Sequence, residues 1–598
     1  MGAALNQRDL KGAQVAYFCA EIGIEGLPFG GGLGVLAGDY LKSCADLSLP
    51  VVGIGILYNR GNFHQELGPD GWQTERYDGF DPTGRMRFHP NITSIPIEGR
   101  PVGLSAWQHH IVGETGHTVP LLLADTNGNN HDRPRDDSIC DILYPSQHQD
   151  PYHRLAQELV LGIGGVRILE ALAYKDVKIY HPNEGHAALL AFPLIKKYCS
   201  IEEARKHIVF TTHTPVFSGI DEFSRELAEQ VLKSDLPSRE YMRNLTGVEH
   251  LNMARLAMAM AYHPFGVSPL HAEVSKFLFS DFPNIRVLDS KDNGVHLATW
   301  ASPQVQRLYD RVAPEWRLKP KGLERILELS EEEVINAHNP SRENLGHLLS
   351  SKRARGNADY DPNKLTIGFS RRFATYKQAT LIFEDADRLA RLGNDIQIVI
   401  AGKSHPTDNP GKEEIKEVFR YMRELKGRVA IRFIEDYDIE IAKLLVRGVD
   451  VWLNNPQRYK EASGTSGMKA AANFVPQISI IDGWSVPQEP ASGYELPKGL
   501  IESVTGWGIG RMPSRQDLIE LLGPNGESKR ALDRKIDAAS LYDKLEHIIT
   551  LFKNDKRAWA KVMRAAAAHN APWFNTHRMA EQYFEEVYNI PLKELVLA

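Results

Sequence analysis

Short apolar runs alternate with amphipathic stretches in the second half of the chain. Five apolar runs have the length of strands, and three stretches have helical spacing: 365–369, 396–401, 429–434, 449–453 and 478–481, then 378–392, 413–425 and 439–447. Such alternation is typical of parallel strands joined by right-handed helical crossovers. The pattern therefore predicts a doubly wound α/β sheet in this half.

A similar unit opens the chain. An apolar run at 15–20 precedes a glycine-rich segment at 30–34, a helical pattern at 35–47 and a second apolar run at 51–57. Open parallel sheets bind ligands where such a segment follows its strand, and glycines let a phosphate approach the backbone. A plain tight turn explains the glycines equally well, and no Gly-Lys-Ser/Thr follows that would make a P-loop.

Composition bounds the class of protein. The 598 residues exceed what one hydrophobic core supports, so two or more domains are expected, and 42% apolar with 24% charged residues indicates a globular chain. The net charge of −6 gives no excess of positive charge that would indicate nucleic-acid binding. Four scattered cysteines predict reduced thiols in a cytoplasmic protein, and no apolar run reaches membrane-spanning length. No nucleic acid, membrane or metal partner is predicted.

Small residues and one lysine separate an apolar run from a helical stretch near residue 465. The segment Glu-Ala-Ser-Gly-Thr-Ser-Gly-Met-Lys occupies positions 461–469. Free backbone N–H groups and the helix dipole favour an anion at such a place. Lys469 is then either a counter-charge or an amine that forms a Schiff base. A small-residue turn with a solvated lysine is the alternative interpretation.

Three cations follow the run at 365–369, namely Arg371, Arg372 and Lys377. A solvated charged face is the usual meaning of such a cluster, but these residues come directly after an apolar strand. A phosphate dianion needs several charge-assisted hydrogen bonds, and arginine supplies a planar fork for them. The cluster is therefore a candidate phosphate site.

Polar residues also end two strands of the first half. His213 follows the run at 207–212, and a satisfied core histidine is as good an interpretation as a ligand contact. Asn183, Glu184 and His186 can bind sugar hydroxyls, although Asn183 equally suits a helix cap. No His-Glu-x-x-His or similar metal spacing occurs.

These motifs together resemble the α-glucan phosphorylases, the glycogen, starch and maltodextrin phosphorylase family, and in particular its short bacterial type. The resemblance extends from about residue 16 to about residue 588. It implies a GT-B fold, with two doubly wound Rossmann-like lobes and an active site in the crevice between them. It further implies reversible, retaining phosphorolysis of α-1,4-glucan to glucose 1-phosphate, with pyridoxal 5'-phosphate as the acid/base group.

The resemblance also implies a domain division and partners. Residues 1–300 would form the N-terminal lobe on the glucan and substrate-phosphate side, 301–575 the cofactor lobe, and 576–598 a helix that crosses back. The expected ligands are α-1,4-glucan or maltodextrin, inorganic phosphate and glucose 1-phosphate, and a homodimer is one expected assembly. Lacking the extra N-terminal region of longer members, the chain is expected to lack their phosphorylation and nucleotide control.

Roles for single residues follow from the same resemblance. The catalytic residues would be Lys469, Arg372, Lys377 and His213. The cofactor would contact Lys469, Thr465, Ser466, Arg371, Lys377, Trp300 and Tyr437. The substrates would contact Gly31, Gly32, Leu33, Glu21, His213, Asn293, Glu461, Ser463 and Gly464. A gate loop is expected at 146–150, followed by Arg154.

Some positions depart from the family pattern. Asp292 stands where a threonine is usual and adds a charge near the expected sugar site. Tyr459, Lys460 and Phe474 replace smaller or apolar residues, and Gln457 replaces an arginine. These changes are expected to crowd the floor of the site. Two other functions stay open: a nucleotide-sugar-dependent GT-B glycosyltransferase, which would not need Lys469, and a glucan-binding relative with little turnover.

Overall fold

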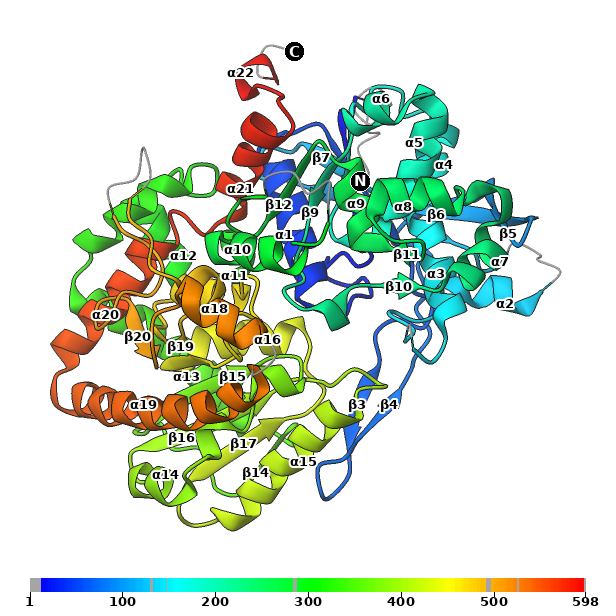
Figure 1. The fold of residues 1–598 in the computed structure, drawn as a ribbon. Helices are drawn as coiled ribbons and strands as arrows, with labels where there is room; N and C mark the ends of the chain where they lie inside the picture. The colour runs from blue at the N-terminus through cyan, green and yellow to red at the C-terminus, as the bar shows by residue number, and fades with distance from the viewer. Residues whose placement is uncertain are drawn as a thin grey trace. The chain divides into compact units, whose positions relative to one another are not determined.

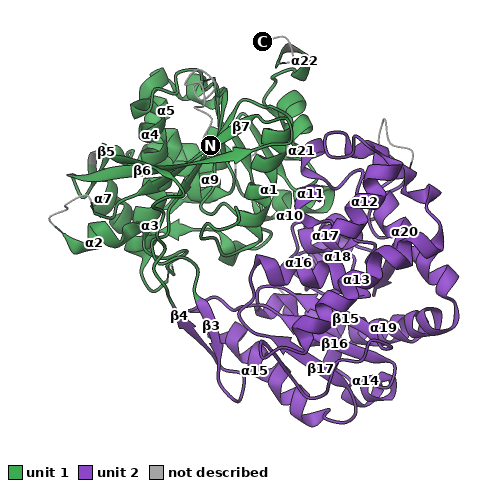
Figure 2. Ribbon diagram, turned by 180° about the vertical axis from the view of Figure 1, so that it is seen from behind, with its two compact units in different colours: residues 1–63, 77–292, 579–598 green, residues 64–76, 293–578 purple. Residues whose placement is uncertain are grey.

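A computed structural model describes residues 12–128, 133–146, 148–282, 288–490, 496–523 and 526–595. The chain forms two compact units (Figure 2). Unit 1 contains Met1–Phe63, Tyr77–Asp292 and Met579–Ala598, and unit 2 contains His64–Arg76 and Asn293–Arg578. The domains predicted from the sequence stay a prediction, and each unit is described below by itself.

Unit 1 is built on a mixed sheet. Its first six strands lie in the order β5 (Arg87–Ile97), β6 (Arg100–Val112), β7 (Thr118–Asp125), β2 (Val51–Ile56), β1 (Val15–Phe18) and β8 (Ile179–Pro182). The strands β7, β2, β1 and β8 are parallel, whereas β5 and β6 form an antiparallel edge. Isolated bridges connect β8 to a parallel group of β9 (Val209–Thr211), β12 (His263–Gly266) and β13 (Asp289–Ser290). The hydrophobic pattern did not predict β5 to β7.

Helices pack against this sheet. They are α1 (Gly32–Asp46), α3 (Pro151–Leu159), α4 (Gly165–Ala171), α5 (Ala191–Tyr198), α6 (Ile201–Arg205), α7 (Arg225–Leu232), α8 (Arg239–Thr246), α9 (Met253–Met260) and α10 (Pro269–Leu278), with a short α2 (Pro134–Asp137). The long helix predicted from Arg154 begins at Pro151 and includes a π-turn at Val160–Gly164. A Cβ on Gly162 would lie 2.8 Å from the backbone nitrogen of Leu190, so close packing explains this glycine.

The C-terminal segment belongs to the core of unit 1. After α21 (Thr576–Gln582), a π-turn at Tyr583–Val587 buries its aromatic side chains against β1 and α1. The hydroxyl of Tyr588 lies 2.9 Å from that of Tyr40 and 2.8 Å from Nδ1 of His181. Burial lowers the pKa of His181 to about 3, so its ring is neutral and depends on these partners.

Replacing Tyr588 by phenylalanine should therefore destabilise the protein. The substitution keeps the ring but leaves a buried imidazole nitrogen without its partner, which costs about 1–3 kcal/mol. Urea unfolding followed by circular dichroism measures the change. Tyr198→Phe is the matched control, because the Tyr198 ring is only half-buried, and it should change stability by less than about 0.5 kcal/mol. Equal stability of Tyr588→Phe and the control would contradict the assigned role.

Unit 2 is a doubly wound sheet (Figure 1). Its strands lie in the order β14 (Ala354–Gly356), β17 (Ala430–Ile434), β16 (Ile396–Ala401), β15 (Leu365–Ser370), β18 (Val451–Asn454), β19 (Gln477–Ile480) and β20 (Gly506–Ile509). All neighbours are parallel except β14 and β17. The strand order therefore reverses between β15 and β18, and open α/β sheets bind ligands at such a switch point.

The helices of unit 2 follow the predicted alternation with one correction. They are α11 (Leu297–Trp300), α12 (Pro303–Val312), α13 (Glu331–Leu349), α14 (Ala386–Leu392), α15 (Asn409–Glu424), α16 (Ile439–Gly448), α17 (Thr465–Ala471), α18 (Arg515–Leu522), α19 (Gly526–Asn554) and α20 (Lys556–Asn570). The helix predicted at 378–392 begins only at Ala386, because the Asp385 side chain caps it and Gln378 has a φ of 51°. Within the described ranges, no helix combines the length and apolar composition needed to cross a bilayer.

One hairpin belongs to unit 2 although it lies between segments of unit 1 in the sequence. Strands β3 (His64–Leu67) and β4 (Gln73–Arg76) form it. His64 Nδ1 lies 2.8 Å from Oδ2 of Asp436, and Gln73 donates to the carbonyl of Ser404 at 2.9 Å. Chain order alone would place these residues in the N-terminal lobe, but polar contacts across more than 300 residues attach them to unit 2.

Candidate functional site

Predicted cationic residues meet at the switch point of unit 2. Strands β15 and β18 end there, at Ser370 and Asn454. Arg371 donates to the side-chain oxygen of Asn454 and, at 2.5 Å, to Oε2 of Glu461. Lys377 Nζ donates to the same oxygen at 2.6 Å. The two cations and the carboxylate were predicted as ligand-binding residues, whereas Asn454 was not assigned a role.

The charges of this cluster are tightly coupled. Burial would raise the pKa of Glu461, but Arg371 and Lys377 outweigh burial and lower it to about 2. Arg372 has an exposed side chain. Burial likewise favours the neutral form of Tyr376, yet the charges of Lys377 and Arg372 bring its pKa below the usual value. The strand tip is therefore strongly positive, which suits a dianion.

A second buried carboxyl supports the first. The backbone N–H of Glu461 donates to Oδ2 of Asp482 at 3.2 Å, and that of Gly483 donates to Oδ1 at 2.8 Å. Burial and the neighbouring charge of Glu461 raise the pKa of Asp482 to about 7. Asp482 was missed by the sequence analysis, although it directly follows the apolar run at 478–481 and the strand-tip argument would have found it.

Lys469 projects from helix α17. Its Nζ lies 4.0 Å from the ring centroid of Trp300, so the amine sits over an aromatic face. The carbonyl of Trp300 accepts hydrogen bonds from Asn473 Nδ2 and Arg447 Nε, each at 3.0 Å. These two contacts hold the indole beneath the amine, and neither Asn473 nor Arg447 was predicted to act here.

The start of α17 is suited to an anion. Gly464 precedes the helix with a φ of 85°, and no side chain in the described part of the chain caps the helix N-terminus. Thr465 and Ser466 lie half-buried in the first turn, and Trp452 Nε1 donates to the Ser466 hydroxyl at 3.2 Å. Tyr437 follows β17, the second strand from β15, and burial raises its pKa.

Two predicted sugar contacts carry unpaired polar atoms. Ser463 Oγ and Asn293 Oδ1 are both buried, and neither has a hydrogen-bond partner among the described residues. Buried polar atoms are nearly always paired in folded proteins, so each is a candidate for a ligand hydroxyl. The backbone of Asn293 is fixed, since its carbonyl accepts from Arg578 at 3.2 Å.

The family departures Tyr459 and Phe474 are core residues of unit 2. The hydroxyl of Tyr459 lies 3.1 Å from Oδ2 of Asp517, and Phe474 packs edge-on against Tyr309 at a centroid distance of 6.3 Å. Both side chains are fully buried. Both residues are therefore part of the packed core of unit 2, and their expected effect on the site stays a prediction.

In unit 1, the carboxylate of Glu21 binds the backbone of the glycine-rich segment. Its Oε2 accepts from the backbone N–H groups of Gly30 at 2.8 Å and Gly31 at 2.6 Å, and Tyr144 donates to Oε1 at 3.1 Å. The segment predicted as a loop is partly helical, because α1 begins at Gly32 and therefore includes Leu33. Of the amides predicted for phosphate, that of Gly31 thus donates to a carboxylate of the chain itself, whereas the roles of Gly32 and Leu33 stay a prediction.

Alanine at position 34 should report on this contact. A Cβ on Gly34 would lie 2.7 Å from Oε2 of Glu21, so Gly34→Ala should cost about 1–2 kcal/mol through overpacking. In a Glu21→Ala background the same change should stabilise the protein by up to about 1 kcal/mol, because alanine is the better helix former. Thermal unfolding of the four variants measures this sign reversal. A Gly34→Ala effect of equal sign and size in both backgrounds would refute the contact.

His213 is held among polar groups of unit 1. Its Nε2 lies 2.7 Å from Asn183 Oδ1, and its backbone N–H donates to Oε2 of Glu184 at 2.7 Å. Burial, with smaller contributions from the positive charges of His271 and His186, lowers the pKa of His213 to about 3. The ring is therefore neutral, and the structure brings together the predicted residues His213, Asn183 and Glu184.

Arg154 is buried in an ionic cluster. It pairs with Asp221 at 2.7 Å and with Glu158 at 3.2 Å, and His186 Nε2 lies 3.5 Å from Asp221. The Glu158 contact has the i, i+4 spacing of a helix and could have been found from the sequence. In the predicted gate loop, Gln147 lies outside the described residues.

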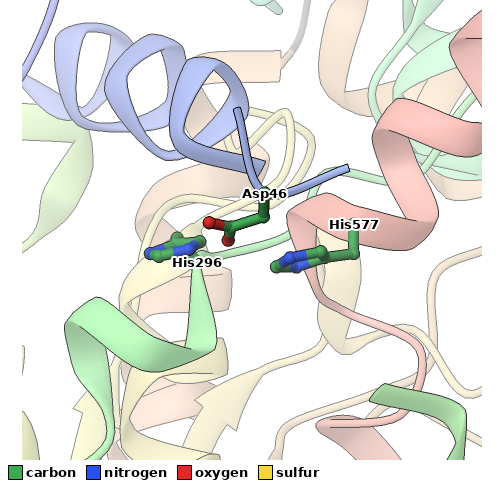
Figure 3. Close-up of side chains that lie close together, drawn as sticks. All are labelled: Asp46, His296 and His577. Atoms are coloured by element: carbon green, nitrogen blue, oxygen red, sulfur yellow. The ribbon is translucent and has the colours of Figure 1, made fainter. Parts of the chain in front are cut away.

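Two further histidines of unit 2 stack on each other. The rings of His296 and His577 have centroids 5.6 Å apart and planes inclined by 22° (Figure 3). Nδ1 of His296 is 2.8 Å from the hydroxyl of Thr299. Figure 3 also draws Asp46, whose carboxylate accepts from the backbone N–H of Glu114 within unit 1 at 2.8 Å. The sequence analysis singled out neither His577 nor Asp46.

The sheet of unit 2 and the cations at its switch point define an α/β protein with a cationic cluster at its strand ends, a place suited to anionic ligands. The model of the family described as carbohydrate phosphorylase matches residues 25–90 and 203–495. The chain belongs to this family, and its fold is of the GT-B type with two Rossmann-like units.

Characterised relatives agree over most of the chain. It is 35% identical to maltodextrin phosphorylase of Thermococcus litoralis, an alignment that covers 98% of this chain and 71% of the relative. It is 34% identical to glycogen phosphorylase of Mycobacterium tuberculosis, with 96% and 70% covered. It is 33% identical to glycogen phosphorylase of Aquifex aeolicus, with 95% and 84% covered.

Proposed function

We propose that the protein is an α-glucan phosphorylase, which converts α-1,4-glucan and inorganic phosphate into glucose 1-phosphate, reversibly and with retention. The observation that carries the proposal is the pair of cations Arg371 and Lys377 on Glu461 at the switch point of unit 2, together with Lys469 on α17, the helix that follows β18. Its relatives are named maltodextrin and glycogen phosphorylases. The proposed substrates are glucan or maltodextrin and inorganic phosphate. The proposed enzyme acts in the cytoplasm as a homodimer.

Pyridoxal 5'-phosphate fits the residues of unit 2. Lys469 offers a primary amine over the indole of Trp300, and Arg371 and Lys377 offer charge for a phosphate. The uncapped start of α17 supplies backbone N–H groups beside Thr465 and Ser466. When bound, the cofactor would supply a phosphate that donates and accepts a proton, rather than an electron sink.

The other residues would bind and orient the substrates. Arg372 and Lys377 would hold the substrate phosphate, because a guanidinium fork and an ammonium satisfy its oxygens. Asn293 Oδ1 and Ser463 Oγ would pair with glucosyl hydroxyls. In unit 1, the Nε2–H of neutral His213 donates to Asn183 Oδ1, so its Nδ1 would accept a hydrogen bond from a glucosyl hydroxyl without adding charge to the site.

The remaining proposed contacts come from residues of both units. Gly31, Gly32 and Leu33 would offer backbone N–H groups to the substrate phosphate, in competition with the Glu21 carboxylate that accepts from Gly31. Glu461 and Gly464 would line the glucosyl position next to Ser463. Tyr437 would contact the cofactor from the end of β17.

A phosphorolysis assay tests the proposal. Purified protein with maltodextrin or glycogen and phosphate should release glucose 1-phosphate, and the same sample should show the absorbance of bound cofactor. Incubation with nucleotide sugars and a maltodextrin acceptor should transfer no glucosyl group. Transfer from a nucleotide sugar without glucose 1-phosphate release would instead identify a nucleotide-sugar-dependent glycosyltransferase. Glucan binding with neither reaction would identify a relative with little turnover.

A further inference from the structure

The loop 461–464, which precedes α17, is held by the turn that follows β19. This turn is a 3-10 helix with Asp482 as its N-cap. The backbone N–H of Glu461 donates to Oδ2 of Asp482 at 3.2 Å. The backbone N–H of Trp484 donates to the carbonyl of Ser463 at 3.0 Å. The turn therefore binds the loop at two backbone positions, one before and one at Ser463.

The turn is itself fixed by a capping box. The N–H of Asp482 donates to Oγ of Ser485 at 3.0 Å, and Oδ1 of Asp482 accepts from the N–H of Gly483 at 2.8 Å. The carbonyl of Ser485 accepts from the N–H of Leu500 at 3.0 Å. Asp482 and Ser485 are fully buried. The two carboxylate oxygens of Asp482 thus connect the turn to the loop, because one accepts from each.

Glycine at position 483 lets the turn approach the loop this closely. Its φ is 56°, and a Cβ there would lie 2.5 Å from the carbonyl oxygen of Ser463. A side chain at this position would be strained and would displace the loop. At the other end of the loop, Gly464 has a φ of 85°, and a Cβ there would lie 3.3 Å from Cδ of Glu461. The backbone on both sides of Ser463 is therefore closely confined.

We propose that Asp482 and Gly483 are positioning residues for the Ser463 hydroxyl, and that the hydroxyl fixed in this way recognises one hydroxyl group of the substrate's glucosyl residue. This inference rests on the proposed function, which takes Ser463 as a substrate contact. Ser463 Oγ is buried and has no partner among the described residues, so a ligand hydroxyl would satisfy it. A substrate analogue without that hydroxyl would leave Ser463 unpaired in a buried place and is rejected for this reason.

Monodeoxy analogues of glucose 1-phosphate test the proposal in the direction of glucan synthesis. The measured quantity is the ratio of kcat/KM for glucose 1-phosphate to kcat/KM for each analogue. This ratio does not depend on the fraction of enzyme that is folded, so a loss of stability alone leaves it unchanged. In Ser463→Ala, the ratio for one analogue should fall at least tenfold, which identifies the hydroxyl that Ser463 recognises.

Asp482→Asn should lower the ratio for the same analogue at least fivefold and leave the other ratios within twofold. Asparagine has the shape of aspartate but only one side-chain oxygen, so it cannot accept from both backbone N–H groups. In a Ser463→Ala background, Asp482→Asn should change no ratio by more than twofold, because the hydroxyl through which it acts is absent. Gly483→Ala should behave in the same way, and Asp482→Asn decides the test if that variant does not fold.

Asp385→Ala is the matched control. Asp385 also accepts from a backbone N–H, that of Arg388 at 2.8 Å, but it caps α14 and not the loop. Its ratios should equal those of the wild type. Wild-type ratios in Asp482→Asn, or an equal effect of Asp482→Asn with and without the Ser463 hydroxyl, would overturn the positioning role while the proposed function stands. A wild-type protein that does not use glucose 1-phosphate would overturn the proposed function and this role together.

Discussion

Lys469→Ala should lose the absorbance of bound cofactor and reduce phosphorolysis by at least about a thousandfold. Lys469 is the amine in the proposed cofactor site, and it lies on the face of Trp300. Without that amine the cofactor has no covalent attachment, and a positioned acid/base group contributes about 10²–10⁴-fold to the rate. Absorbance spectra and initial rates of glucose 1-phosphate release measure the two effects.

Lys469→Arg separates charge from covalent attachment. Arginine keeps a cation over Trp300 but does not form a Schiff base, so this variant should be as inactive as Lys469→Ala. Lys426→Ala removes an exposed lysine of the same unit and should retain both absorbance and rate. Turnover by Lys469→Arg at the wild-type rate would show that the lysine acts only as a counter-charge.

Glu461→Gln should lower the free energy of unfolding by about 3 kcal/mol at pH 5. The carboxylate offsets part of the charge of Arg371 and Lys377 in a buried place, and glutamine would leave both cations without a carboxylate partner. Added sulfate or phosphate should raise the unfolding temperature of the variant more than that of the wild type, because an oxyanion takes the place of the missing charge. Differential scanning calorimetry with and without the anion measures this difference.

The stability gap between wild type and Glu461→Gln should depend on pH. The pKa of Glu461 is about 2 in the folded state against a reference of 4.5, so its stabilisation is present above pH 4.5 and is lost as the pH falls. Asp482 has the opposite shift, to about 7 from 3.8, and destabilises the wild type increasingly as the pH rises toward 7.

The charge of Glu461 is one cause of the raised pKa of Asp482. The pKa of Asp482 is therefore raised less in Glu461→Gln, and ionising Asp482 destabilises the variant less than the wild type. The difference in unfolding free energy between wild type and Glu461→Gln should therefore be largest near pH 5 and should decrease both below and above that pH. Thermal unfolding of both proteins across this pH range measures it. A gap that does not change between pH 3 and pH 8 would contradict the assigned coupling of the two carboxyl groups.

The position of the strand-tip residues could be predicted from the sequence, but their contacts could not. Arg371, Lys377 and Glu461 lie next to apolar strands in sequence, so the topology of a parallel sheet alone places them at one edge. The same logic applied to Asp482 would have found the second carboxyl. It could not show that both cations share one oxygen of Glu461, since that depends on the side-chain conformations of residues 84 and 90 positions away.

The hydrophobic pattern of the sequence did not predict other parts of the structure. The hairpin at His64–Arg76 is short and polar, and only contacts such as that of His64 with Asp436 assign it to unit 2. The expected helix at 378–392 failed because helical spacing does not reveal the left-handed backbone of Gln378 or the cap at Asp385. The contacts of Tyr459 with Asp517 and of Phe474 with Tyr309 also arise only in the fold, and the family pattern does not reveal them.

The sequence by itself determined the alternation of strands and helices, the family and the residues that carry charge at the strand ends. These features are local, since they depend on hydrophobic period and on short motifs. Only the tertiary structure decided which two cations donate to one oxygen of Glu461 and which backbone amides donate to Glu21. The physical reason is that burial and distance set these interactions, and both arise between segments far apart in the chain.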